Sequence, residues 1–182
     1  VLFDRTEGGA TMPGTAGIGH TRWATHGEPS DVNSHPHLSH SGRVAVVHNG
    51  IVENYAELRE FLTEHGYEFQ SDTDTEIVAQ LVDFYYHGDP VKAVRDAESL
   101  LSGSYALGIA FAAHPDLLIA VRKDSPLILG LGEGENFIAS DIPALLKHTR
   151  EIVRLDEREL AVLTRAGVSV YDRFGDPVEK AP

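Results

Sequence analysis

The chain has 182 residues, of which 42% are hydrophobic and 24% are charged, a composition typical of a globular protein with its own core. Its 28 acidic residues outnumber its 15 Lys and Arg, and the formal net charge of −13 argues against nucleic acid or an anionic membrane as the main partner. The absence of cysteine excludes disulfides and thiolate metal ligands within these residues. No apolar run approaches the ~20 residues that span a bilayer, and 1–10 has no signal-peptide pattern. We therefore expect a cytoplasmic enzyme or binding domain.

The first part of the chain combines loop signals with one buried strand. Residues 1–17 are rich in Gly, Thr and Pro and are expected to form a loop or a ragged end. His20 to Ser30 holds a cation, an indole, two imidazoles and a glycine without any apolar period, which indicates a ligand contact rather than core packing. The β-branched run from Arg43 to Asn49 predicts a buried strand that ends at the turn signal Asn49-Gly50.

Three amphipathic helices are predicted next. The first occupies 54–66, with Asn54 as its cap and Gly66 at its end. The second begins at Thr73, which has Glu76 at capping-box spacing. The third has Asp89 at its cap, followed by a proline in its first turn.

Short β-type runs then replace the helical period, and they continue to residue 173 with one short helix predicted at 142–148. The predicted order is one strand, then three helices, then a long series of strands. This order favours antiparallel sheets covered by helices and argues against a fold of alternating βαβ units. Residues 174–182 are expected to be a frayed tail.

Arg22 is the strongest candidate for binding a ligand. A guanidinium grips a carboxylate through a bidentate fork that lysine does not reproduce, although a surface ion pair is the alternative for this residue. Trp23 is the only tryptophan. It is either a core residue or, beside Arg22, a lid over a ligand.

Six of the ten histidines crowd into 29 residues: His20, His26, His35, His37, His40 and His48. Their spacing lacks the His-Glu-x-x-His pattern of a helix-borne zinc site, and there is no cysteine to join them. We expect hydrogen-bonding histidines in loops and turns, with neither a metal nor a cofactor.

Two further groups of residues have both a structural and a chemical interpretation. Asn49-Gly50 is either a turn or an oxyanion hole, in which the Asn amide and the Gly N–H point at a developing negative oxygen. Asp72 and Asp74 either cap the helix that follows them or hold a ligand ammonium. Leu129 to Asn136 is similar to a phosphate loop only weakly and is predicted to be a hairpin. Together the candidates suggest a site for a molecule with both a carboxylate and an ammonium.

The chain contains four characteristic stretches, in this order: GIGHTRWATHGEPSDVNSHPH, VVHNGIVENYAELR, SDTDTEIVAQLV and SPLILGLGEGENFIASD. Together they resemble the glutaminase domains of the glutamine–fructose-6-phosphate aminotransferase family, which are class II glutamine amidotransferases. The resemblance runs from about Gly17 to about Asp176. NSHPH and GLGEGENFIASD point to this sugar-phosphate family rather than to the phosphoribosyl or asparagine-forming ones.

The resemblance implies an α+β fold of the N-terminal-nucleophile hydrolases, an αββα sandwich of two antiparallel sheets between helical layers. It implies a glutaminase domain at 17–176, an N-terminal remnant at 1–16 and a tail at 177–182. The implied activity is hydrolysis of L-glutamine to L-glutamate and ammonia. A C-terminal isomerase domain would use the ammonia to convert fructose 6-phosphate to glucosamine 6-phosphate, in a homo-oligomer of the full-length protein.

The resemblance also assigns site residues. The substrate-binding residues are Arg22, Trp23, Thr25, His26, Gly50 and Asp74, and the catalytic residues are Asn49 and Gly50. Arg22 would grip the glutamine α-carboxylate and Asp74 the α-ammonium, while Asn49 and Gly50 would form the oxyanion hole. The segment from Arg22 to Ser30 would be a mobile loop that closes on the substrate.

The sequence departs from the family at the nucleophile. The family uses an N-terminal cysteine whose own α-amino group is the base, and this cysteine precedes the HTRW element, which begins here at His20. Since the chain has no cysteine, we expect it to be incomplete at its N-terminus and to hydrolyse no glutamine as it stands. A catalytically dead domain that senses glutamine or mediates contacts is the alternative, as is another class II amidotransferase.

Overall fold

The computed structural model describes residues 2–12, 14–22 and 27–182. Its strands are β1 (His37–Leu38), β2 (Val44–Val52), β3 (Gly103–Phe111), β4 (His114–Lys123), β5 (Ile128–Leu131), β6 (Asn136–Ala139), β7 (Glu151–Arg154), β8 (Leu160–Thr164), β9 (Gly167–Tyr171) and β10 (Pro177–Val178). Its helices are α1 (Leu2–Arg5), α2 (Tyr55–Glu64), α3 (Asp74–Tyr85) and α4 (Pro90–Leu100), with the 3-10 helices η1 (Glu7–Gly9) and η2 (Ile142–Ala144).

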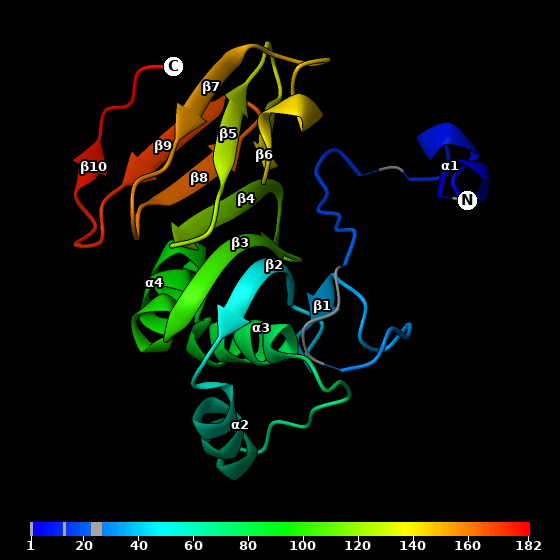
Figure 1. Cartoon of the computed structure of the whole chain (residues 1–182), viewed down its shortest axis with the longest axis vertical. Helices are drawn as coiled ribbons and strands as arrows, with labels where there is room; N and C mark the ends of the chain where they lie inside the picture. The colour runs from blue at the N-terminus through cyan, green and yellow to red at the C-terminus, as the bar shows by residue number, and fades with distance from the viewer. Residues whose placement is uncertain (1, 13, 23–26) are drawn as a thin grey trace.

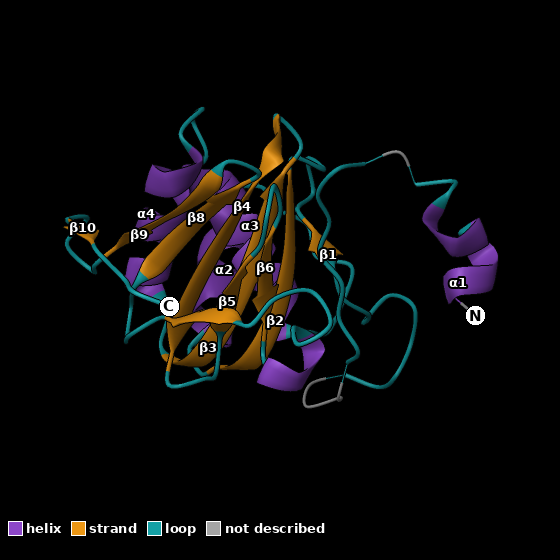
Figure 2. Cartoon of the chain, turned by 90° about the horizontal axis from the view of Figure 1, so that it is seen from above, coloured by secondary structure: helices purple, strands orange, loops and turns teal. Residues whose placement is uncertain are grey.

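These elements form two antiparallel sheets and one helical layer (Figure 1). The large sheet has the order β1-β2-β3-β4-β8-β9-β10, and the small sheet has the order β6-β5-β7. One core lies between the large sheet and the helices, where Ile77 of α3 packs with Val46 and Ile109. A second core lies between the two sheets, where Leu129 of the small sheet packs with Ala120. Figure 2 shows the strands stacked in front of α2 and α3, with α1 lying apart.

The predicted α+β class with two antiparallel sheets is confirmed. Of the helical layers expected on both sides of the sheets, the described residues form the one that covers the large sheet. Within the described ranges the helical layer consists of α2, α3 and α4, because α1, η1 and η2 have only four, three and three residues. The hairpin predicted between Leu129 and Asn136 is also confirmed, since β5 and β6 pair through Leu131 and Asn136.

Helix boundaries follow the local signals with one exception. Thr73 caps α3 by accepting a hydrogen bond from the Glu76 N–H, and Asp89 caps α4 by accepting one from the Lys92 N–H. Asn54 stands at the start of α2 without capping it. Its side chain instead accepts from the Ser102 N–H and donates to the carbonyl of residue 100, so it ties α2 to the end of α4.

Four predicted boundaries are wrong. The expected N-terminal loop contains α1 and η1, because Thr6 caps the short 3-10 turn through a bond from the Gly9 N–H. Strand β2 continues to Val52, past the predicted turn. The predicted helix at 142–148 is reduced to η2. The predicted frayed tail contains β10, and Lys180 beyond it forms ion pairs with two acidic side chains.

A buried carboxylate fastens the turn before β2 onto α3. Asp83 is 2% exposed, and its Oδ1 accepts hydrogen bonds from Ser39, Ser41 and Arg43 at 3.2, 2.5 and 3.0 Å, while Oδ2 accepts one from Tyr67 at 3.1 Å. Burial raises the pKa of Asp83, but the hydrogen bonds from Arg43 and Ser41 outweigh burial and hold it below its ordinary value. The ionised carboxylate therefore holds the turn that leads into β2.

We expect Asp83→Asn to destabilise the fold by about 1–3 kcal/mol at neutral pH, because buried donors lose a charged acceptor. The ionised group stabilises the protein above its unfolded pKa of about 3.9, and this contribution is lost as pH falls through the lower folded pKa. Urea unfolding from pH 7 to pH 2 should show a smaller acid-induced loss for Asp83→Asn than for the unaltered protein. Asp141→Asn, at an exposed side chain that caps nothing, is the control; identical pH profiles for both variants would contradict the prediction.

Candidate active site

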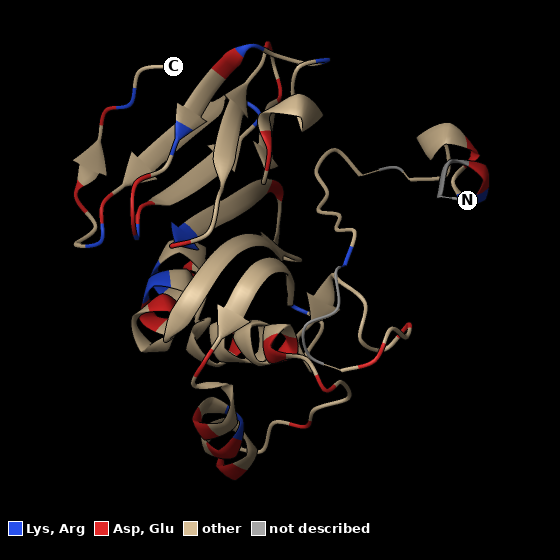
Figure 3. Ribbon diagram, viewed as in Figure 1, with Lys and Arg blue, Asp and Glu red and all other residues tan. Residues whose placement is uncertain are grey.

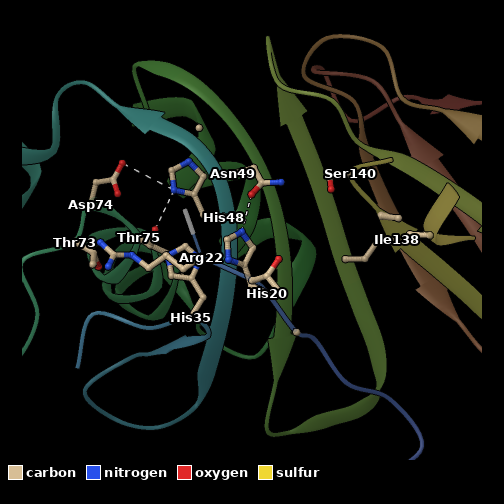
Figure 4. Close-up of a pocket in the computed structure, with 15 residues that line it drawn as sticks. His20, Arg22, His35, His48, Asn49, Thr73, Asp74, Thr75, Ile138 and Ser140 are labelled. Atoms are coloured by element: carbon tan, nitrogen blue, oxygen red, sulfur yellow. Dashed lines mark hydrogen bonds and ion pairs between the residues drawn. The ribbon is translucent and has the colours of Figure 1, made fainter. Parts of the chain in front are cut away.

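A pocket of about 560 Å³ opens where the two sheets approach the beginning of α3 (Figure 4). Its lining residues are Gly19, His20, Thr21, Arg22, His35, His48, Asn49, Gly50, Thr73, Asp74, Thr75, Ile138, Ala139, Ser140 and Ala144. They come from the segment before β1, from the middle of β2, from the first turn of α3 and from the end of β6 with η2. Segments far apart in the sequence therefore build one cavity.

Strand β2 presents two neighbouring side chains to different parts of the pocket. Successive strand residues point to opposite faces, so His48 faces α3, where its Nδ1 lies 3.0 Å from Thr75 Oγ1. Asn49 points the other way, and its Oδ1 lies 2.6 Å from His20 Nε2. Figure 4 shows the amide oxygen of Asn49 turned toward His20 and its nitrogen turned away, on the side of Ser140.

The turn interpretation of Asn49-Gly50 is wrong, because both residues lie inside β2. Gly50 pairs with Tyr105 of β3 and has φ of 125°, which favours glycine. A Cβ on Gly50 would stand 2.1 Å from the carbonyl oxygen of Ser104. Asn49-Gly50 was a misleading turn signal. Glycine is common in turns because it tolerates a positive φ, but here that tolerance allows β2 to approach β3 closely.

Asp74 lies at the base of the pocket, 4% exposed, and does not cap α3. Its Oδ2 accepts a hydrogen bond of 2.9 Å from the Val52 N–H and lies 3.9 Å from His48 Nδ1. Thr73 provides the cap instead, and the Asp72 N–H donates to a side chain of another segment. The capping interpretation of both aspartates is therefore wrong, and Asp74 remains as a buried carboxylate that lines the cavity.

Arg22 lines the same pocket as Asp74 and Asn49. Its guanidinium donates to the carbonyl oxygens of Gly27 and Glu28 at 3.1 and 3.3 Å. The structure therefore brings together Arg22, Asn49, Gly50 and Asp74 among the predicted site residues. The predicted Trp23, Thr25 and His26 lie outside the described residues.

Three imidazoles contact one another through tilted and edge-on pairs, and two of them, His20 and His35, line the pocket. The ring centroids of His20 and His35 are 4.4 Å apart, and those of His35 and His37 are 5.2 Å apart. Burial, assisted by the neighbouring imidazole of His20, lowers the pKa of His35 to about 3, so this ring is neutral at pH 7. His37 Nε2 lies 2.9 Å from Thr73 Oγ1. The hydrogen-bonding interpretation holds for His20, His37 and His48, but His37 and His48 stand in strands rather than loops. The buried Nδ1 of His35 has no hydrogen-bond partner in the described part of the chain.

No cluster of three or more His, Asp or Glu suited to a metal ion occurs within residues 2–12, 14–22 and 27–182. None of the helices in these ranges is long and apolar enough to cross a membrane.

The charges of the pocket differ from those of the molecule as a whole. Figure 3 shows acidic and basic residues spread over the helices and connecting segments, while β2 and β3 carry none. Among the described residues, the ionisable groups of the lining other than imidazoles are Arg22 and Asp74. A guanidinium and a carboxylate in one cavity complement a ligand with a carboxylate and an ammonium, and the Asn49 amide nitrogen can donate to a further oxygen.

One wall of the pocket was not among the predicted site residues. Ile138, Ala139 and Ser140 belong to a short β-type run that is also part of a stretch carrying the family resemblance, but nothing in their residue types marked them as pocket residues. In the sequence, His20 and His35 stand out only as part of the histidine-rich region. Their positions on either side of Arg22, within one loop-rich stretch, are the sequence feature that could have predicted them as site residues.

Comparison with known proteins defines the class. The glutamine amidotransferase domain family matches residues 6–174, and the chain belongs to this family. A glutamine–fructose-6-phosphate aminotransferase (isomerizing) of Clostridium perfringens is 62% identical over 169 residues, which cover 93% of this chain and 28% of that protein. An enzyme of the same name from Thermus thermophilus is 49% identical over 173 residues, covering 95% and 28%. The chain thus spans about 28% of the length of these curated relatives.

The fold agrees with this assignment. A solved glutamine phosphoribosylpyrophosphate amidotransferase from B. subtilis, complexed with ADP and GMP, superposes with a TM-score of 0.71 at 24% identity. The superposition covers 85% of this chain and 34% of that one. At this identity the likeness concerns the fold alone, which is that of the N-terminal-nucleophile hydrolases expected from the sequence.

We expect Gly50→Ala to lower the melting temperature by at least about 2 °C, because a positive φ alone costs ~1–3 kcal/mol and each kcal/mol shifts a chain of this size by ~2–4 °C. The contact with the Ser104 carbonyl adds to this cost. Gly167→Ala is the matched control, since a Cβ there meets nothing within 4 Å and its φ is not left-handed. Thermal unfolding followed by circular dichroism makes the comparison, and equal melting temperatures would contradict the close-approach explanation.

Proposed function

We propose that this chain is the glutamine-hydrolysing domain of an enzyme that transfers glutamine nitrogen to fructose 6-phosphate. The observation that supports it most directly is that Arg22, Asn49 and Asp74 line one pocket of about 560 Å³. These three groups complement the carboxylate, the side-chain carbonyl and the ammonium of L-glutamine. The names of the relatives supply the acceptor sugar.

Hydrolysis adds water across the side-chain amide of glutamine and gives glutamate and ammonia. Attack on the amide carbon moves negative charge onto the carbonyl oxygen, so a preorganised donor at that oxygen lowers the barrier. The Asn49 amide nitrogen is such a donor, with the backbone of Gly50 beside it. Arg22 and Asp74 hold the two charged ends of the amino acid and thereby fix the position of the reacting carbonyl.

The resemblance implies that the nucleophile is an N-terminal cysteine, and the 182 residues contain no cysteine. Activity experiments therefore use the protein expressed from its complete gene. For that protein we propose a glutaminase unit at 17–176, a C-terminal isomerase domain that consumes the ammonia, and a homo-oligomeric, cytoplasmic enzyme.

The test is steady-state release of ammonia from L-glutamine by this full-length protein, with and without fructose 6-phosphate. Release that fructose 6-phosphate stimulates is the expected result. Release without stimulation would point to another class II amidotransferase. If the protein binds glutamine but releases no ammonia, the result would favour a domain that senses glutamine without hydrolysing it.

We expect Arg22→Lys in the full-length protein to raise the KM for glutamine at least tenfold with a smaller effect on kcat, because lysine cannot form the bidentate fork with the α-carboxylate. Initial rates over a range of glutamine concentrations separate the two constants. Arg59→Lys, on α2 and outside the pocket lining, is the control. An unchanged KM in Arg22→Lys would remove Arg22 from the substrate site.

We expect Asn49→Ala to lower kcat by ~10²–10³, the range found when one oxyanion donor is removed. The KM should change little, since the oxyanion exists only in the transition state and not in the bound substrate. The same rate measurements apply. A decrease in kcat of less than about threefold would mean that Asn49 has only a structural role in β2.

A further inference from the structure

His20 contacts the proposed oxyanion donor, and the proposed function leaves it without a role. Its Nε2 lies 2.6 Å from Asn49 Oδ1, and the two residues are 29 positions apart in the sequence. The contact is short for a bond between nitrogen and oxygen. It joins the segment before β1 to the middle of β2, at the wall of the pocket.

The other ring nitrogen decides which atom of His20 carries the proton. His20 Nδ1 is buried and has no hydrogen-bond partner in the described part of the chain. A proton on Nδ1 would be a buried donor without an acceptor, which costs ~1–3 kcal/mol. The proton is therefore placed on Nε2, from which it is donated to Asn49 Oδ1.

A bond to Oδ1 determines what the rest of the Asn49 amide presents. With its oxygen held by His20, the amide turns its NH₂ group away from His20, as Figure 4 shows. The flipped amide would present its oxygen instead, and an acceptor facing a developing oxyanion would repel it. The identity of the group at this position is thus set by a proton on a neighbouring ring.

We propose that His20 is a positioning residue, whose Nε2–H holds the Asn49 amide so that its nitrogen donates to the oxyanion formed from the substrate carbonyl. This inference rests on the proposed function. The ring of His20 is itself held against His35, with centroids 4.4 Å apart and planes inclined by 38°. Because the pKa of His35 is lowered to about 3, His20 packs on a neutral ring at pH 7.

The test uses three variants of the full-length protein that differ in where a donor remains. Glutamine places an amide N–H near the position of Nε2, asparagine places one nearer that of Nδ1, and phenylalanine has none. We expect His20→Phe and His20→Asn to lower kcat about 10²-fold, the low end for loss of an oxyanion donor. The KM for glutamine should stay within about threefold, and His20→Gln should recover kcat to within about fivefold of the unaltered protein.

A merely structural histidine would behave differently. If shape alone mattered, Gln, Asn and Phe would not be ordered by the position of their donor, and equal losses in all three would overturn the proposal. His87→Phe, at an exposed histidine outside the pocket, should leave kcat unchanged and controls for general effects of the substitution.

A double substitution tests whether His20 acts through Asn49. In an Asn49→Ala background, His20→Phe should cost less than about threefold more, because the group it positions has been removed. Fully multiplicative losses would overturn the proposal. Long-range ¹H–¹⁵N spectra give a reading independent of rates: protonated Nε2 and unprotonated Nδ1 are expected for His20, and the opposite tautomer would overturn the inference.

These outcomes separate the two proposals. If the unaltered full-length protein releases no ammonia from glutamine, the proposed function fails, and the catalytic role of His20 fails with it. If the protein is active and the His20 variants show no donor dependence, only the positioning role of His20 is overturned.

Discussion

The pairing of β2 with β3 through Gly50 is the contact on which the site depends. The two strands stay in register from Val44 to Val52, without the interruption that Asn49-Gly50 leads one to expect. Continuity of the strand keeps its alternation, which sends His48 toward α3 and Asn49 toward the small sheet. A turn at Gly50 would have ended the strand at Asn49 and separated the amide from the first turn of α3.

Two buried carboxylates attach β2 to α3. Asp83 gathers donors from the turn before β2 and fixes it on α3. Asp74 accepts from the Val52 N–H, so the first turn of α3 is fixed at the other end of the same strand. The strand is thus attached to one helix at both ends. Buried carboxylates that accept hydrogen bonds are suited to this, because their bonds are charge-assisted and expensive to break.

The pocket combines opposite charges with one imidazole that stays neutral at pH 7. Arg22 and Asp74 can each bind one end of an amino acid, while the imidazole of His35 adds polar surface without adding charge at pH 7. The net negative charge of the molecule does not set the local charge of this site, since β2, which carries Asn49, and the adjacent β3 hold no Asp, Glu, Lys or Arg. The selectivity proposed for the pocket therefore depends on a few groups at short range.

The amino-acid sequence was enough to predict the caps at Thr73 and Asp89 and the β5–β6 hairpin, because each depends on residues within a few positions of one another. It also predicted the antiparallel strand series from successive short β-type runs, and the family from the order of four characteristic stretches. Packing in three dimensions was needed to show that Gly50 serves a close approach of strands, that Asp74 binds the Val52 N–H, and that His20 contacts Asn49. Each of these contacts joins residues more than twenty positions apart. The same side chain can make a local bond or a distant one. The packing of the large sheet between α3 and the small sheet determines which of the two partners is within reach.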